Sequence, residues 1–263
     1  MNSAEFYIGW QSQAPPGVGS YVRKNVTALC VFAVSLAGLF AILQRSIGVA
    51  VFRWGTHKTF TGILRASPYP HLSLIQPGLS AGQSDYLLVG PFKHGLDAKS
   101  ISSLDGKLVS LKGTLIFRDN QTMIEALAET IKATPQPNSQ LSITDHQSTI
   151  IDHVTLRGEI VDSKCYFGVM NPGRLTPHRG CAVRCISGGI PPVLLVHEKD
   201  GPAKTYLLVS NDGSPVNKEV LDMVAEPVQI TGDLVQQGSL TILRADPSTY
   251  RRFKNWTTNS LHF

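Results

Sequence analysis

The part of the chain that follows residue 55 contains the same series of short motifs twice. The repeated pairs are residues 60–64 with 156–160, 86–89 with 206–209, and 109–116 with 228–235. The second pair is Tyr-Leu-Leu-Val in both copies, and the first pair shares a central glycine. Motifs that recur in a fixed order predict two structural units of the same design.

Each copy consists of short strand-like segments separated by turn residues, with little helical periodicity. A segment such as residues 216–224, which could form a short helix, precedes two closing strands. Five strands with a helix before the fourth is the pattern of the OB-fold, a small Greek-key barrel. We therefore expect a mainly β fold in which one N-terminal transmembrane helix is followed by two tandem small OB-like β-barrels. Another small barrel or a sandwich is the alternative.

An 18-residue run without a charged residue, residues 26–43, lies between Arg23-Lys24 and Gln44-Arg45. At about 1.5 Å per residue this run just crosses a hydrocarbon core, and residues 47–52 with Trp54 could extend the helix to the interface. A cleavable signal peptide is the competing interpretation, because Ser35-Leu36-Ala37 resembles a cleavage site. The long polar leader, with its aromatic and proline residues, favours an uncleaved anchor that crosses the membrane once.

The orientation of this anchor is predicted from its layout. Two basic residues precede the run and three follow it, Arg45, Arg53 and Lys58, so the positive-inside count alone favours a cytoplasmic C-terminal part. A short tail, one helix and a large domain form the usual layout of a signal anchor. We therefore expect a bacterial inner-membrane protein with its soluble domains in the periplasm.

The predicted division of the chain has six parts. They are an N-terminal cytoplasmic tail (1–24), a transmembrane anchor helix (25–54), OB-like domain 1 (55–134), a linker (135–152), OB-like domain 2 with a Cys-containing insertion (153–247) and a C-terminal tail (248–263).

Charge and motifs exclude several classes of protein. The net charge is +5, but +2 of it lies in residues 1–52, and the rest is too weak for a nucleic-acid surface. We find no nucleophile elbow, Walker loop, dinucleotide fingerprint, zinc-protease motif or haem motif. Paired carboxylates do not stand out either. The sequence therefore gives no indication of an enzyme.

The second copy contains an insertion that holds three cysteines. The offset between copies increases from 96 residues at the first motif to 120 at the second, and Cys165, Cys181 and Cys185 lie in that interval. Thr176 and Pro177 predict a helix start with Thr176 as N-cap, and Gly188-Gly189 predicts its end. His178, Cys181 and Cys185 would then share one helix face.

These residues predict a metal site made by Cys165, His178, Cys181 and Cys185. Three thiols and an imidazole suit zinc, and the same set, or one with Met170, suits copper. The alternative is a structural disulfide between Cys165 and either Cys181 or Cys185. One thiol would then be left over for a metal or for thiol-redox exchange. Cys30, in the apolar run, is expected to be inert.

The cysteine segment resembles a group of exported bacterial OB-like domains. The matching residues are Asp162, Cys165-Tyr166, His178, Cys181-Ala182, Cys185-Ile186, Gly189 and Pro191, followed by Tyr206-Leu207-Leu208, and the resemblance covers residues 154–245. It implies that the cysteines belong to a recurring module, without implying an activity. The first copy lacks the motif.

Two functional hypotheses follow. The first is a membrane-anchored, non-catalytic accessory subunit that binds other subunits of a membrane complex handling electrons or metals. The second is a copper- or zinc-binding or thiol-redox protein that uses the Cys165, His178, Cys181 and Cys185 cluster. His94, in a predicted loop of the first copy, is a weaker ligand candidate.

Overall fold

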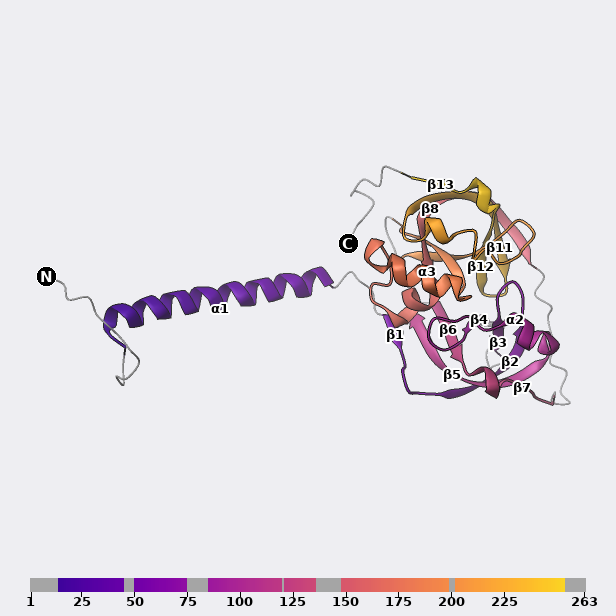
Figure 1. The fold of residues 1–263 in the computed structure, drawn as a ribbon, viewed down its shortest axis with the longest axis horizontal. Helices are drawn as coiled ribbons and strands as arrows, with labels where there is room; N and C mark the ends of the chain where they lie inside the picture. The colour runs from indigo at the N-terminus through magenta and orange to yellow at the C-terminus, as the bar shows by residue number, and fades with distance from the viewer. Residues whose placement is uncertain are drawn as a thin grey trace. The chain divides into compact units, whose positions relative to one another are not determined.

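The computed structural model describes residues 14–44, 50–74, 85–119, 121–135, 148–198 and 202–253. Contacts within the chain divide it into two compact units, residues 1–47 with residue 263, and residues 48–262. The first unit contains the helix α1, and the second contains two barrels, with barrel 1 largely in magenta and barrel 2 in orange to yellow (Figure 1).

The helix α1 (Pro16–Gln44) has 29 residues, so it extends about 43 Å at about 1.5 Å per residue. Among the described residues it is the one helix that is long and apolar enough to cross a membrane. Apolar side chains such as Leu29 and Phe32 are exposed all along it. The chain therefore fits a single-span membrane protein, as the apolar run predicts.

The helix differs at both ends from the predicted anchor of residues 25–54. It begins at Pro16, because the fixed φ of proline suits a first helical position, so residues 16–24 are helical. It ends at Gln44, and the predicted extension to residue 54 was wrong, because β1 (Ala50–Phe52) is a strand. This strand pairs antiparallel with β5, and Phe52 packs on the core, which stabilises the extended conformation.

Barrel 1 is a closed ring of five strands. They are β2 (Lys58–Arg65), β3 (His71–Leu74), β4 (Asp85–Val89), β5 (Leu108–Arg118) and β6 (Gln121–Ala126). The ring runs β2-β3-β4-β6-β5 and closes between β5 and β2, and the β4–β6 pair is parallel. The short helix α2 (Ala98–Ile101) and the 3-10 turn η2 (Ser102–Leu104) precede β5, and η3 (Ala128–Thr130) and β7 (Lys132–Ala133) follow β6.

Barrel 2 repeats the same ring. Its strands are β8 (Thr149–Asp162), β9 (Pro192–Val196), β10 (Lys204–Val209), β11 (Pro227–Gln237) and β12 (Leu240–Arg244). They run β8-β9-β10-β12-β11 and close between β11 and β8, again with one parallel pair, β10–β12. The turn η7 (Pro247–Thr249) leads to β13 (Arg251–Arg252), which pairs with β11. The predicted pair of small OB-like barrels is confirmed.

The two barrels bury the same positions. The equivalent core pairs, first barrel 1 and then barrel 2, are Leu64 and Ile160, Leu72 and Leu194, Leu88 and Leu208, Leu111 and Ile230, and Ile124 and Leu243. Each of these side chains is at most 1% exposed. Because strand residues alternate between faces, the repeated pattern of apolar residues produced the same interior twice.

Three details differ from the predicted boundaries. Residues 149–152, assigned to the linker, belong to β8, and Arg251 and Arg252, assigned to the tail, form β13. The segment 216–224 contains only the 3-10 turn η6 (Leu221–Met223). The first two segments are strands because each pairs with β11. The turn η6 has only three residues, which is too short for an α-helix. Most of the predicted linker and the end of the tail lie outside the described residues.

The barrels pack against each other through equivalent positions. One apolar cluster contains Leu87 with Leu207, Val89 with Val209, Ile116 with Val235, and Met123 with Ile242, each pair being one position in the two copies. A surface that meets its own copy in this way is the hallmark of a two-fold, isologous interface. The repeat therefore associates within one chain as two subunits of a dimer would.

The insertion (residues 163–191) joins β8 to β9, the loop between the first two strands where we expected it. It contains η4 (Cys165–Val169), the 3-10 turn η5 (Thr176–His178) and the helix α3 (Arg179–Ser187). Barrel 1 supports it directly. The Arg118 guanidinium donates to the Tyr166 carbonyl at 2.6 Å and lies 4.5 Å from the centre of the Tyr166 ring.

Candidate metal centre

Asp162, the last residue of β8, holds the start of the insertion in place. Its Oδ1 accepts the backbone N–H of Cys165 at 2.7 Å, and its Oδ2 lies 3.0 Å from Nε2 of His178. The Asp162 side chain has no exposed surface. Because a buried carboxylate is stable only when its hydrogen bonds are satisfied, Asp162 fixes Cys165 and His178 relative to the barrel.

The three sulfurs of the insertion converge on one small volume. Sγ of Cys165 lies 4.0 Å from Sγ of Cys181 and 3.9 Å from Sγ of Cys185. Cys165 comes from η4, whereas Cys181 and Cys185 are four residues apart on α3 and so project from one face. Cys165 and Cys185 are 3% and 1% exposed, whereas Cys181 is only partly buried. All four cysteines of the chain, including Cys30 in α1, are free thiols.

His178 completes the predicted set. Ligand atoms of Cys165, His178 and Cys181 all lie within 4.8 Å of one another, and so do those of Asp162, Cys165 and Cys185. A histidine that binds a metal usually offers its second nitrogen to a carboxylate, and Asp162 supplies that carboxylate. The structure thus places the four residues that the sequence singled out in two overlapping groups that share Cys165, with Asp162 in contact with His178.

The helix that carries these ligands starts differently from the prediction. Thr176 is not an N-cap; it is the first residue of the 3-10 turn η5, and no side chain caps that turn. The preceding residue, Leu175, has a left-handed φ of 68°, and its backbone N–H donates to the Glu159 carboxylate at 2.5 Å. The Glu159 carboxylate on β8 therefore accepts a backbone N–H just before the turn, where a local N-cap at Thr176 was predicted.

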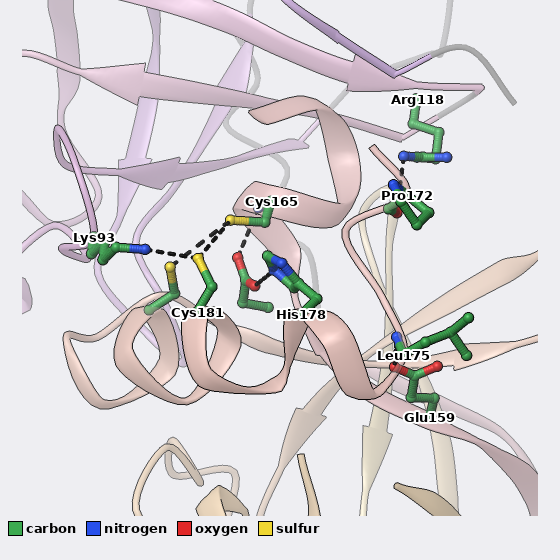
Figure 2. Close-up of polar contacts among 10 residues, drawn as sticks. Lys93, Arg118, Glu159, Cys165, Pro172, Leu175, His178 and Cys181 are labelled. Atoms are coloured by element: carbon green, nitrogen blue, oxygen red, sulfur yellow. Dashed lines mark hydrogen bonds and ion pairs between the residues drawn. The ribbon is translucent and has the colours of Figure 1, made fainter. Parts of the chain in front are cut away.

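A residue of barrel 1 also reaches the cluster. Nζ of Lys93 lies 2.7 Å from Sγ of Cys181 (Figure 2). Lys93 belongs to the loop of residues 90–95 that follows β4, and this loop contacts α3 through a hydrogen bond from the Gly95 N–H to the Gly188 carbonyl at 2.8 Å. Lys93 and the weaker ligand candidate His94 are both exposed, but the Lys93 ammonium has a partner in the cluster.

The Lys93 loop is anchored by a buried ion pair. Lys164, next to Cys165, lies 2.5 Å from a Glu125 carboxylate oxygen, and the two side chains are 2% and 9% exposed. The Lys164 ammonium also donates to the carbonyls of Gly90 and Phe92 at 2.8 and 2.6 Å. The insertion of barrel 2 therefore fixes the loop of barrel 1 that carries Lys93.

Hydrogen bonding shifts the pKa values of Cys165 and Cys185 in opposite directions. The pKa of Cys165 is raised because its thiol donates a hydrogen bond to Cys185 and is buried. The pKa of Cys185 is lowered because it accepts that hydrogen bond and because the Lys93 ammonium is near. The contact with Cys181 in turn raises the pKa of Lys93. Between this hydrogen-bonded pair, negative charge is therefore favoured at Cys185 over Cys165.

The two sulfur separations that involve Cys165 match a tetrahedral metal site. With metal–sulfur bonds of about 2.3 Å, two sulfurs on one tetrahedral ion lie about 3.8 Å apart. The observed separations of 3.9 and 4.0 Å differ from that value by only about 0.1–0.2 Å. Met170, the alternative copper ligand, is 45% exposed, in contrast to the buried Cys165 and Cys185.

Comparisons with known proteins add no assignment to this geometry. No protein-family model matches the chain, and a search of curated proteins found no match.

Proposed function

We propose that this protein is a membrane-anchored, non-catalytic metal-binding subunit of a membrane complex that handles electrons or metals. The ion is Zn²⁺ or Cu⁺, and its ligands are Cys165, Cys181, Cys185 and His178. On this proposal α1 anchors the chain in a bacterial inner membrane, and the barrels lie on the periplasmic side.

The observation that carries the proposal is the convergence of three thiols and one carboxylate-held histidine. The Cys165 sulfur lies 4.0 Å from that of Cys181 and 3.9 Å from that of Cys185, and the ligands come from separate elements of the insertion. Soft thiolates select Zn²⁺ and Cu⁺ over hard ions such as Mg²⁺ and Ca²⁺. Three thiols with one histidine also form a common structural zinc site.

The test is elemental analysis of the full chain, purified in mild detergent without chelator. We expect about one Zn or Cu per chain, and loss of that metal in Cys165→Ser and Cys185→Ser. The matched control is Cys30→Ser, which removes the one cysteine outside the cluster and should keep the metal. Absence of metal in both reduced and as-isolated protein would refute the metal-binding proposal.

The same preparation tests the role of a subunit. We expect other membrane proteins to co-purify with the chain, because an accessory subunit is held in its complex by contacts with the other subunits. If gentle solubilisation at native expression yields only a monomer, the accessory role is refuted, even if metal is present.

A disulfide is the second candidate for the cluster. Cys165 lies almost equally close to Cys181 and Cys185, and a bond would require the sulfurs to approach from about 4 Å to about 2.05 Å. Mass mapping of free thiols separates the two functions. With Cys30 counted separately, three cluster cysteines that become alkylatable only after metal removal support the metal site, whereas one alkylatable cluster cysteine supports a disulfide.

A further inference from the structure

Cys181 differs from the other two cluster cysteines in two ways. It alone is partly open to solvent, since Cys165 and Cys185 are almost completely buried. It alone has a cation at hydrogen-bond distance, the Lys93 ammonium at 2.7 Å. A structural metal site is closed on all sides, so one accessible ligand indicates a site from which the ion can leave.

The loop that carries Lys93 has a second support besides its hydrogen bond to Gly188 at the end of α3. The Lys164 ammonium donates hydrogen bonds to the Gly90 and Phe92 carbonyls of this loop and forms an ion pair with Glu125. Figure 2 shows Lys93 reaching the cluster from the side opposite to His178. An ammonium ion fixed in this way can stabilise a thiolate at Cys181 whether or not that sulfur is bound to the metal.

We propose that the site exchanges its metal with an external thiol by ligand substitution at Cys181, and that Lys93 receives the displaced Cys181 thiolate. The external thiol is a low-molecular-weight thiol or a cysteine of a metal-carrying partner. This inference rests on the proposed metal-binding function and adds the chemical class of the partner and the point of transfer.

The exchange step balances without an oxidant or reductant. The incoming thiol loses its proton to water and its sulfur forms a bond to the metal, while the bond from the metal to Sγ of Cys181 breaks. The Cys181 sulfur keeps both electrons of the broken bond and remains a thiolate beside Lys93. Two further external thiols and one water molecule then replace Cys165, Cys185 and His178 on the ion in turn, one bond forming as each one breaks. Each incoming thiol loses its proton to water, each departing sulfur keeps its electron pair, and the reverse sequence loads the site.

The test follows metal loss from the full chain in detergent, loaded with one equivalent of Zn²⁺ or, in a parallel series, Cu⁺. The rate of loss is measured against glutathione concentration. We expect the rate to rise linearly with glutathione, and the slope to fall about tenfold in Lys93→Gln, because the displaced thiolate loses a charged hydrogen bond. Lys93→Arg should keep most of the slope.

Two comparisons distinguish this role from a structural one. The intercept at zero glutathione, which reports spontaneous loss, should change by a smaller factor than the slope in Lys93→Gln. The matched control Lys99→Gln removes an exposed lysine of barrel 1 away from the cluster and should keep the wild-type slope.

Three results would overturn the inference. They are a wild-type rate that does not depend on glutathione, a Lys93→Gln slope equal to or above that of the wild type, and a change confined to the intercept. Failure of the wild-type chain to retain metal at all is a different result, since it refutes the proposed function itself.

Discussion

Asp162 contacts two of the predicted ligand residues, Cys165 and His178. One of its oxygens positions Cys165 through the backbone, and the other faces His178. It has no exposed surface, so water cannot replace it. The geometry of the cluster therefore depends on a carboxylate that is not itself one of the four predicted ligands.

Replacement of this carboxylate by an amide tests the contact with His178. In Asp162→Asn the amide oxygen can still accept the Cys165 N–H, but the NH₂ group cannot accept a hydrogen bond from the imidazole. We expect the affinity for Zn²⁺ to fall about 10–100-fold, as is typical when the partner of a ligand histidine is lost. Competition with a chelator of known affinity measures the change.

The exposed turn residue Asp212 provides the control for that experiment. Asp212→Asn also removes one carboxylate from barrel 2, and it should leave the affinity for Zn²⁺ unchanged. An Asp162→Asn protein with wild-type affinity would mean that His178 does not bind the ion.

At the scale of elements, the repeated glycines show why the two copies share a pattern. Gly62 and Gly158 occupy the same position in β2 and β8, and a Cβ there would lie 2.4 Å from the carbonyl oxygen of Ser73 or Leu195, respectively. No side chain fits at that distance from the backbone of the neighbouring strand. The first two strands of each barrel therefore approach so closely that the position requires glycine, which explains why glycine recurs there in both copies.

Alanine substitutions at these glycines should destabilise each barrel. We expect Gly62→Ala and Gly158→Ala each to lower the free energy of unfolding by roughly 1–3 kcal/mol, because the strand must shift to admit the methyl group. Chemical denaturation of the full chain in detergent measures the change. Gly180→Ala, in α3, meets no atom within 4 Å and should be neutral or slightly stabilising. Equal effects at all three positions would contradict this explanation.

The cysteine insertion is the element that distinguishes the two copies. It replaces the short connection between β2 and β3 of barrel 1 with η4, η5 and α3, and it carries every candidate ligand. Arg118 of barrel 1 and Glu159 of barrel 2 both hold its backbone. The insertion is thus stabilised from both barrels and does not fold as a free loop.

For the whole molecule, the buried pair of Lys164 and Glu125 connects the two barrels next to the cysteine cluster. Lys164 lies one residue before Cys165, and Glu125 lies in β6 of barrel 1. Charges with so little exposure are stable only as a pair. The barrels are therefore linked by specific polar contacts in addition to the apolar cluster that contains Leu87 and Leu207.

Removal of one partner of this pair should cost more than removal of both. We expect Lys164→Met to lower the free energy of unfolding by about 3–5 kcal/mol, because Glu125 stays buried without its cation. The double variant Lys164→Met/Glu125→Leu should recover much of that loss. Denaturation of the wild type, Lys164→Met, Glu125→Leu and the double variant in detergent gives the coupling energy. If the double variant is as unstable as the sum of the single variants, the pair is not coupled.

The sequence by itself determined the features that depend on local pattern. Alternating apolar residues and recurring glycines predicted two barrels of the same strand order, and the apolar run predicted one membrane helix. The spacing of His178, Cys181 and Cys185 predicted a shared helix face, since residues three and four apart on a helix are neighbours whatever surrounds them. These patterns involve residues that are close in the sequence, so they can be recognised without knowing which distant residues they contact.

Only the tertiary structure decided which distant residues meet the cluster and where the elements end. Lys93 and Cys181 are 88 residues apart, and Lys164 and Glu125 come from different barrels. The strand at residues 50–52 and the uncapped start at Thr176 likewise depend on β5 and on Glu159. Such contacts form because two barrels with the same apolar face pack on each other, and no local period in the sequence records which polar side chains that packing brings together.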